Sequence, residues 1–274
     1  MPAASHSRIP RAYEGGALKL HRGAVFGEVS IAPSPFDNGG KAAISKAGTP
    51  LAINNLSLGV AADLPCSTGR GGARNRADRE SHELTAAHVA NLKAAERHAA
   101  LIGLPFTRML TIHWEAAGVP LEYMAKATGK LLDLLTRWLA RRGHRSAWLW
   151  VHENGDRKGG HCHLLARIPA GLVKALTGKL LGWLRTITLR TYRARVIYSR
   201  PIGGRLGIET SNPDLYAINL EAALAYVLKG ACPEAASQFG LERLEPGGLV
   251  IGKRCGTSQN IGAKERQQSA EAGC

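Results

Sequence analysis

Residues 150–169 read WVHENGDRKGGHCHLLARIP, two short apolar runs on either side of a glycine-rich, charged turn. The segment NGDRKGG contains the Asn-Gly and Gly-Gly pairs that are typical of β-hairpin loops. Side chains alternate across a strand, so His161 and His163 share one face and Cys162 takes the other. The stretch therefore predicts a hairpin that presents two imidazoles side by side.

A carboxylate can join these imidazoles. Glu153 shares their face if the hairpin pairs odd-numbered residues with odd-numbered ones, whereas His152 shares it in the other register. Two imidazoles and a carboxylate form a ligand set for Mg²⁺, Mn²⁺ or Zn²⁺. The competing interpretation is a chance alternation of histidines on a half-exposed strand, and the hairpin by itself does not decide between the two.

The segments around the hairpin alternate between strand and helix patterns. Apolar residues at helical spacing and β-branched runs set their boundaries. We expect helices over 83–101, 121–142, 171–187 and 219–231, and strands over 106–114, 146–153, 161–169 and 194–202. This order predicts an α+β domain with a central, largely antiparallel sheet of about five strands, covered by helices on one face.

The composition is strongly basic. Thirty-six Lys and Arg against 21 Asp and Glu give a formal charge of +15, which favours a polyanionic partner such as nucleic acid. No run of about 18 consecutive apolar residues and no signal peptide is evident, so we expect a cytoplasmic protein without a membrane partner. The five cysteines form no CxxC pair and indicate free thiols.

The ends of the chain differ from the middle. Residues 1–80 are rich in Gly, Pro, Ser and Ala and include the basic tract STGRGGARNRADRE, which predicts a disordered arm, or else a segment that precedes the true start of translation. We expect the folded domain over 81–262 and a disordered tail over 263–274.

The helix expected over 219–231 carries a second candidate group. Its apolar stripe leaves Tyr226 on another face, with Lys229 three positions later. A phenol beside an ammonium is suited to attack on a phosphodiester. A tyrosine at a helix flank with a solvated lysine is the ordinary alternative for any single YxxK.

Taken together, these motifs resemble the HUH endonuclease superfamily, the single-tyrosine Rep-type nicking enzymes that initiate rolling-circle replication. The resemblance covers roughly 105–260: FTRMLTIHW is similar to the first strand, HCH to the histidine signature, and AYVLKG to the catalytic YxxK. GKRCGTSQNIG, residues 252–262, is a weaker match to a C-terminal segment of bacterial and phage Rep proteins.

The resemblance implies an HUH-like, RRM-like palm and a mechanism. Glu153, His161 and His163 would hold Mg²⁺ or Mn²⁺, Tyr226 would form a 5′-phosphotyrosine with single-stranded DNA or an origin hairpin, and Lys229 would assist. The sequence lacks a GxxxxGK[ST] motif, so strand separation would fall to a host helicase or to a cruciform origin.

Further residues extend the expected site. His113 either approaches the metal or only sits on the sheet, and we favour the second. Interleaved with Tyr192 and Tyr198 is a set of arginines suited to backbone contact and base stacking by single-stranded DNA. They are Arg190, Arg193, Arg195, Arg200 and Arg205.

Three other functions fit parts of the pattern. A transposase or relaxase would use the same chemistry on a different substrate. A catalytically inactive nucleic-acid-binding regulator would keep the scaffold alone. A zinc-dependent hydrolase would use the same ligands without a covalent step, so it would not need Tyr226.

Overall fold

A computed structural model describes residues 78–156 and 158–272 of the chain. All of them belong to one unit, 65–274. The basic arm expected over residues 1–80 therefore lies almost entirely outside the described residues.

The predicted hairpin is present and has the register that brings the three candidate ligands together. β3 (Trp148–Gly155) pairs antiparallel with β4 (Gly159–Ala166), and Glu153 lies directly opposite His161. Gly159 has a φ of +60° at the end of the turn, a conformation that glycine adopts without steric cost. This is the odd-with-odd pairing, so His152 faces the other side of the sheet.

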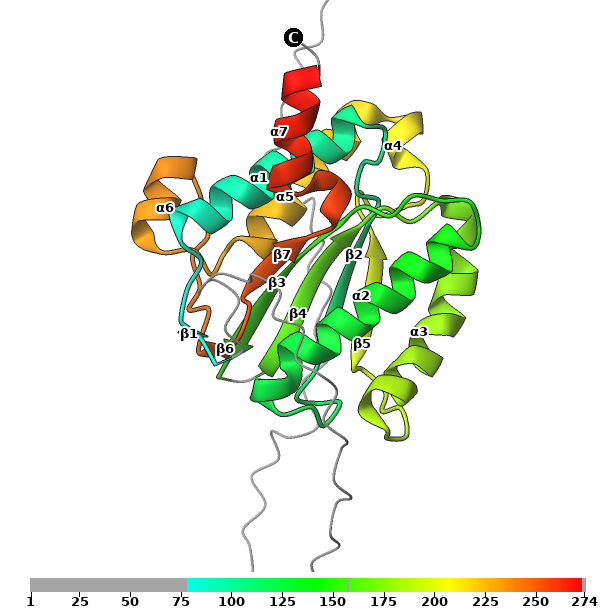
Figure 1. The fold of residues 1–274 in the computed structure, drawn as a ribbon, viewed down its shortest axis with the longest axis vertical. Helices are drawn as coiled ribbons and strands as arrows, with labels where there is room; N and C mark the ends of the chain where they lie inside the picture. Colours follow the sequence, from blue (N-terminus) through cyan, green and yellow to red (C-terminus); the bar gives the residue numbers. More distant parts are fainter. Residues whose placement is uncertain (1–77, 157, 273–274) are drawn as a thin grey trace, which may run out of the picture. The chain divides into compact units, whose positions relative to one another are not determined.

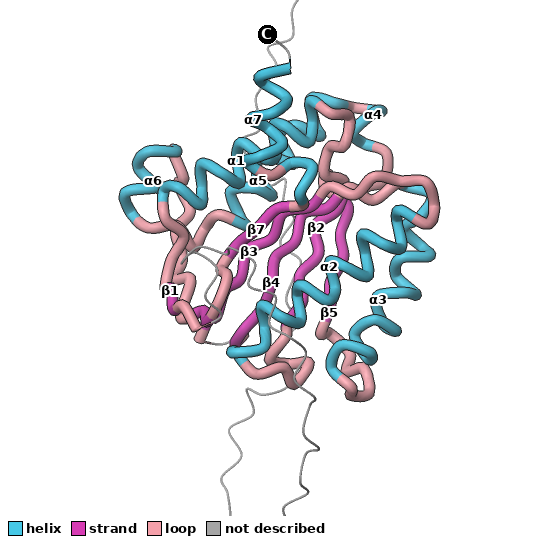
Figure 2. The backbone as a smooth tube through the Cα atoms, viewed as in Figure 1, coloured by secondary structure: helices cyan, strands magenta, loops and turns pink. Residues whose placement is uncertain are grey.

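The hairpin forms the middle of a five-stranded sheet (Figures 1 and 2). Its order is β5-β2-β4-β3-β7, with every neighbouring pair antiparallel, which confirms the predicted α+β class. The added strands are β2 (Arg108–His113), β5 (Ile197–Pro201) and β7 (Cys255–Thr257). A separate pair joins β1 (Glu80–Ser81) to β6 (Val250–Ile251).

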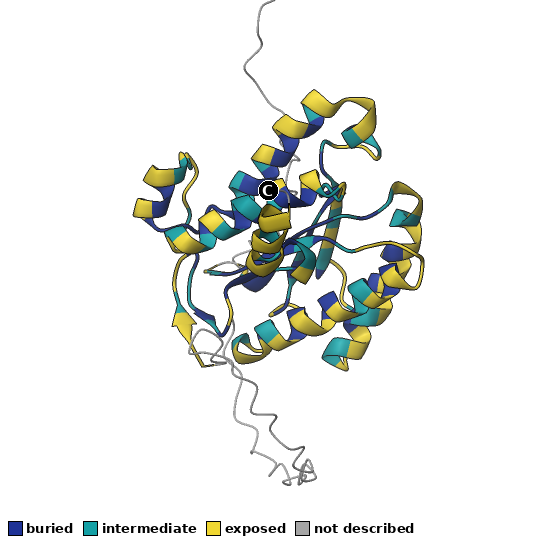
Figure 3. Cartoon of the chain, turned by 45° about the horizontal axis from the view of Figure 1, so that its top comes forward, coloured by how far each residue is buried: buried dark blue, intermediate teal, exposed yellow. Residues whose placement is uncertain are grey.

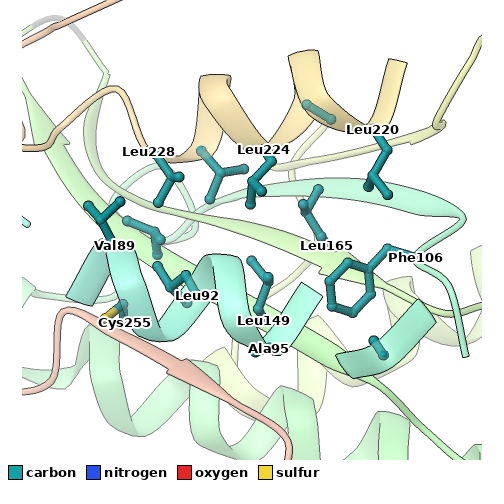
Figure 4. Close-up of a cluster of buried hydrophobic side chains, with 14 of the residues drawn as sticks. Val89, Leu92, Ala95, Phe106, Leu149, Leu165, Leu220, Leu224, Leu228 and Cys255 are labelled. Carbon is teal, nitrogen blue, oxygen red and sulfur yellow. The ribbon is translucent and has the colours of Figure 1, made fainter. Parts of the chain in front are cut away.

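Helices cover both faces of this sheet, not one as expected. α2 (Met124–Ala140) and α3 (Val173–Thr188) lie in front of it in Figure 1 and pack on Leu110, Ile112 and Leu164. α1 (Ala86–Leu101) and α5 (Pro213–Val227) pack with Leu149 and Leu165 from the other face (Figure 4). The expectation was wrong because the central strands are apolar on both faces, and each face needs its own cover.

Local capping sets where the helices begin and end. Thr85 caps α1 through a capping box with His88, and Asn212 accepts a hydrogen bond from the Leu215 amide at the start of α5. α5 ends at Val227, so Lys229 lies beyond the helix and not on its surface as predicted. The expected helix 219–231 is thus shifted toward the N-terminus.

Elements near the C-terminus complete the fold. α4 (Ile208–Ser211) and α6 (Pro233–Phe239) flank α5 in sequence, and α7 (Ala263–Ala272) occupies part of the expected disordered tail. That expectation was wrong for α7, because Arg266 ties it to the fold by donating to the Asn91 side chain and to the Ile261 carbonyl. Short 3-10 turns lie at Leu121–Tyr123, Ala170–Leu172 and Gln259–Ile261.

The segment 252–262 closes the outer edge of the sheet beside β3. Ser258 Oγ accepts a hydrogen bond from the Trp148 amide, and Asn260 donates to the Ser146 carbonyl. The residues of the GTSQN segment thus hold the sheet edge. Burial follows the layers, with exposed residues on the outer helix surfaces (Figure 3).

Within the described ranges, no helix combines the length and the apolar character needed to span a bilayer.

Candidate metal centre

Three side chains converge on one face of the hairpin. The Glu153 Oε2 atom lies 3.3 Å from Nε2 of His161 and 3.3 Å from Nε2 of His163. One ligand atom from each residue falls within 4.8 Å of the others, and all three side chains are buried. A buried cluster of two imidazoles and one carboxylate can hold a metal ion.

The hydrogen bonding of the cluster leaves ligand atoms free. His161 Nδ1 lies 2.8 Å from the Gly159 carbonyl, which can only accept, so Nδ1 carries the proton and Nε2 keeps its lone pair. Glu153 Oε1 and His163 Nε2 are buried and have no hydrogen-bond partner among the described residues. Buried polar atoms without partners are rare in folded proteins, and a cation bound here would satisfy both.

A neighbouring strand orients the second imidazole. Thr111 on β2 pairs with His163, and its Oγ1 atom lies 3.1 Å from His163 Nδ1. A hydrogen-bonding partner on the remaining ring nitrogen is the usual support for a metal-binding histidine. Sequence analysis missed Thr111, although its alternation with His113 along the strand placed it on the correct face.

The electrostatics keep the cluster in its ligand form. Burial would raise the pKa of Glu153, but the close imidazoles of His161 and His163 and the charge of Lys229 outweigh it and hold the pKa well below its usual range. Burial lowers the pKa of His163 despite the opposing effect of Glu153. At neutral pH the carboxylate is therefore ionised and the His163 imidazole is neutral, as metal binding requires.

Lys229 reaches the cluster from the turn after α5. Its Nζ atom pairs with Glu153 Oε2 and lies 2.9 Å from Glu245 Oε2. Burial would lower the pKa of Lys229, but the two carboxylates raise it, so the buried ammonium remains charged. Glu245 also donates its backbone amide to the Lys229 carbonyl at 2.8 Å, which fixes the loop that carries this second carboxylate.

Tyr226 lies against the same cluster. Its half-buried ring is 5.0 Å from the His163 ring, edge to face, and Lys229 Nζ is 5.3 Å from its centroid. Burial raises the pKa of the phenol, an effect that the charge of Lys229 opposes. The structure thus brings all five of the principal predicted site residues together, although Lys229 arrives from a turn and not from the helix.

Arg243 and Glu245 join the site although sequence analysis did not single them out. The Arg243 guanidinium lies 5.1 Å from the Tyr226 centroid, and its Nε donates to Glu245 Oε1 at 2.8 Å. Both residues lie on an irregular segment after α6 with no apolar period, so no local pattern linked them to Tyr226.

Buried Arg254 holds the loop that carries Glu245. Its guanidinium donates to the carbonyls of Ser81, His152, Gly247 and Gly248. Sequence analysis did not single out Arg254, although it belongs to the weakly matched segment 252–262. Its role in the structure is to join the β1 region, β3 and the 247–248 turn.

The remaining predicted residues lie outside the ligand cluster. The His113 ring is 5.4 Å from the His161 ring, yet only Glu153, His161 and His163 form a group of potential ligands among the described residues. The predicted DNA-binding arginines all have exposed side chains and lie before, within and after β5. They are Arg190, Arg193, Arg195, Arg200 and Arg205.

Comparison of the chain with protein-family models, with curated proteins and with solved structures finds no match.

Proposed function

We propose that this protein is a metal-dependent nickase and strand transferase of single-stranded DNA. The observation that carries the proposal is the contact between Tyr226 and His163, 5.0 Å between ring centroids, at a buried set of two imidazoles and one carboxylate. A potential nucleophile next to a ligand set is the arrangement that covalent phosphoryl transfer requires.

Glu153, His161 and His163 would hold Mg²⁺ or Mn²⁺, the ions that the resemblance to HUH endonucleases implies. Such an ion would polarise a phosphate oxygen and stabilise the charge that develops on it. The three ligands come from the protein, which leaves the remaining coordination positions for water and substrate.

The proposed step exchanges one phosphoester for another. Tyr226 Oη attacks the scissile phosphorus, the Oη–P bond forms, and the bond between phosphorus and the 3′ oxygen breaks. The phenol gives up its proton and the departing 3′ oxygen takes one up. The products are a 5′-phosphotyrosine and a free 3′-OH, which can reverse the step and rejoin the strand.

Two cations flank the phenol and support this step. Lys229 and Arg243 both lie near the Tyr226 ring and favour its ionised form against the effect of burial. Arg243 is exposed and has donors suited to a phosphate. Glu245 bonds to both cations, so we assign it the role of positioning them.

The charge of the chain suits a nucleic-acid substrate. The +15 formal charge would attract the phosphate backbone, and the exposed arginines around β5 would contact it. We place the activity in the cytoplasm, at the origin of a plasmid, phage or related element, with strand opening by a host helicase or by a hairpin origin. A transposase or relaxase with the same chemistry is the alternative biological setting.

The test is a denaturing-gel assay for a covalent protein–DNA adduct. Wild type and Tyr226→Phe are incubated with labelled, randomised single-stranded DNA and Mn²⁺, with EDTA as the metal control. Tyr198→Phe is the matched control, because it removes a phenol hydroxyl from the same sheet face but keeps the aromatic ring and does not alter the ligand cluster. We expect an adduct in wild type and Tyr198→Phe that requires metal, and none in Tyr226→Phe.

Two results would overturn the proposal. Metal-dependent cleavage that persists in Tyr226→Phe would identify a hydrolase with the same ligands and no covalent step. Absence of both adduct and cleavage, with binding of single-stranded DNA retained, would identify a binding protein without this chemistry.

A further inference from the structure

A continuous row of aromatic rings crosses the sheet from the candidate nucleophile to the edge strand β5. Tyr226 contacts His163 at 5.0 Å between centroids, and His163 contacts His161 at 4.9 Å. His161 contacts His113 at 5.4 Å, and His113 contacts Tyr198 at 5.7 Å, edge to face. The row thus joins the metal ligands to a tyrosine that the proposed chemistry does not use.

Strand register explains why these rings line up. Tyr198 pairs with Thr111, and Thr111 pairs with His163, so the three residues form one line across β5, β2 and β4. Two strand spacings of about 4.8 Å separate the Tyr198 and His163 backbones by roughly 10 Å. The tyrosine is therefore close enough to receive a nucleotide that flanks a phosphate held at the ligand cluster.

Tyr198 is open to solvent at the edge of the sheet. Its exposed fraction is 42%, whereas the histidines of the ligand cluster are at most 4% exposed. β5 has only β2 as a neighbour in the described part of the sheet, so nothing pairs with its outer side there. A large aromatic side chain held on a rigid strand and exposed at one end of a polar site is a suitable surface for stacking.

The charged residues around Tyr198 indicate which kind of ligand would stack on its ring. Arg200 follows two residues later on the same sheet face, and Arg195 precedes the strand. Both guanidinium groups are exposed and can contact phosphates on either side of a stacked base. Aromatic rings combined with arginines form the surface that binds single-stranded nucleic acid without strict sequence preference.

We infer that Tyr198 is a stacking platform for a nucleobase of single-stranded DNA that flanks the scissile phosphate. This inference rests on the proposed function for its substrate, but it concerns binding and not the chemical step. The His113 ring contacts the Tyr198 ring edge to face and also contacts the His161 ring, so it connects the platform to the ligand cluster.

The experiment measures binding in the absence of chemistry. Full-length Tyr226→Phe protein in EDTA is titrated into labelled oligothymidylate and into an abasic strand of equal length, which has the same phosphates without bases. Tyr198→Ala is added to this background, with Tyr123→Ala as the matched control. Tyr123 is also an exposed tyrosine, 58% exposed, but it lies in the 3-10 turn before α2, and among the described residues no aromatic ring contact connects it to the row.

We expect Tyr198→Ala to weaken binding of oligothymidylate by roughly 5- to 100-fold and to leave the abasic strand unaffected. Tyr198→Trp should retain or tighten binding. Thermal unfolding of each variant controls for folding, and the mutated side chain is exposed, so little change is expected there.

Three outcomes would overturn the inference. Equal effects of Tyr198→Ala and Tyr123→Ala would remove any special role of Tyr198. Equal losses on both strands would show that the ring supports phosphate contacts and not base stacking. If the parent protein bound neither strand, the DNA substrate itself would be wrong, and the proposed function would fail together with the platform.

Discussion

Histidines on the two faces of the β3–β4 hairpin differ in their hydrogen bonding. On the face covered by α2, His152 is fully buried and both ring nitrogens have partners: Nδ1 lies 3.0 Å from the Lys253 carbonyl, and Nε2 lies 2.8 Å from Thr128 Oγ1. On the other face, His163 is also buried, but within the described part of the chain its Nε2 has no hydrogen-bond partner. Two histidines of one hairpin thus have different local chemistry.

This difference separates a structural polar group from a binding one. The hydroxyl of Thr128 accepts a hydrogen bond from Trp114 and donates to His152, so the chain of polar groups on that face is complete. A completed buried network stabilises the fold, whereas an incomplete one indicates a missing ligand or a strained site. Substitutions on the two faces should therefore differ in their effects on metal affinity and on stability.

The largest effect is expected on metal binding, for substitutions on the face that carries the ligand cluster, where the hydrogen-bond network is incomplete. His163→Ala and His161→Ala each remove one of three ligands, and we expect Mn²⁺ binding measured by calorimetry to fall by more than about 100-fold, since loss of a supporting partner alone costs about 10- to 100-fold. The matched change on the other face, His152→Leu, should leave metal affinity within about threefold of wild type. If all three variants lowered metal affinity equally, the proposed difference between the two faces of the hairpin would be wrong.

His152→Leu should instead destabilise the protein. The change leaves the buried Thr128 hydroxyl without an acceptor for its proton and removes the hydrogen bond to the Lys253 carbonyl, and we expect a loss of about 2–3 kcal/mol in the free energy of unfolding. Urea denaturation without metal measures this loss. Adding Thr128→Val leaves the buried Trp114 indole N–H without its acceptor, so the double variant should be less stable still. Its loss should be smaller than the sum of the two single losses, because the Thr128–His152 hydrogen bond is already broken, and a fully additive loss would count against the network.

Thr111→Val tests the support of the ligand cluster. Valine keeps the shape of the side chain but removes the oxygen 3.1 Å from His163 Nδ1. Metal affinity should fall by about 10- to 100-fold. The control is Thr177→Val, an exposed threonine on α3 whose hydroxyl bonds only to its own helix, and it should not change metal binding. An unchanged affinity in Thr111→Val would show that His163 does not depend on this hydrogen bond.

The smallest effect, counted per pH unit, is a pH dependence of the free energy of unfolding that originates at His152. Burial lowers the pKa of His152 to about 3, compared with 6.5 for a free imidazole. Between these values the unfolded chain binds the extra proton, so stability is full above pH 6.5 and falls as pH drops toward 3, by about 1.4 kcal/mol per pH unit. Denaturation at pH 4–7 without metal should show this slope.

His152→Leu supplies the control for that slope. Its free energy of unfolding should depend less on pH over the same interval, because one titrating group has been removed. Burial also lowers the pKa of His113 to about 4, so a smaller slope should remain in this variant. If the slope were the same in wild type and variant, groups other than His152 would be responsible.

Much of the fold could be predicted because its signals are local. The Asn-Gly and Gly-Gly pairs of the turn and the alternation of the flanking runs predicted the hairpin, and the leucine spacing predicted α3, whose Leu176, Leu180 and Leu184 are buried. The end of α5 was misplaced because helical periodicity continues through Lys229, while the backbone stops at Val227. The number of covered faces was also misjudged, since strand patterns do not specify how many helices return to each side.

The sequence by itself determined that His161 and His163 share one face of the hairpin, because alternation is a property of adjacent residues. It left open whether Glu153 or His152 joins them, and the strand register of the folded hairpin decided for Glu153. Only the tertiary structure decided that Lys229, Arg243 and Glu245 gather at Tyr226, that Thr111 supports His163, and that Tyr198 extends the row of rings to the sheet edge. These contacts join distant segments, and their geometry depends on how strands and loops pack around a shared core.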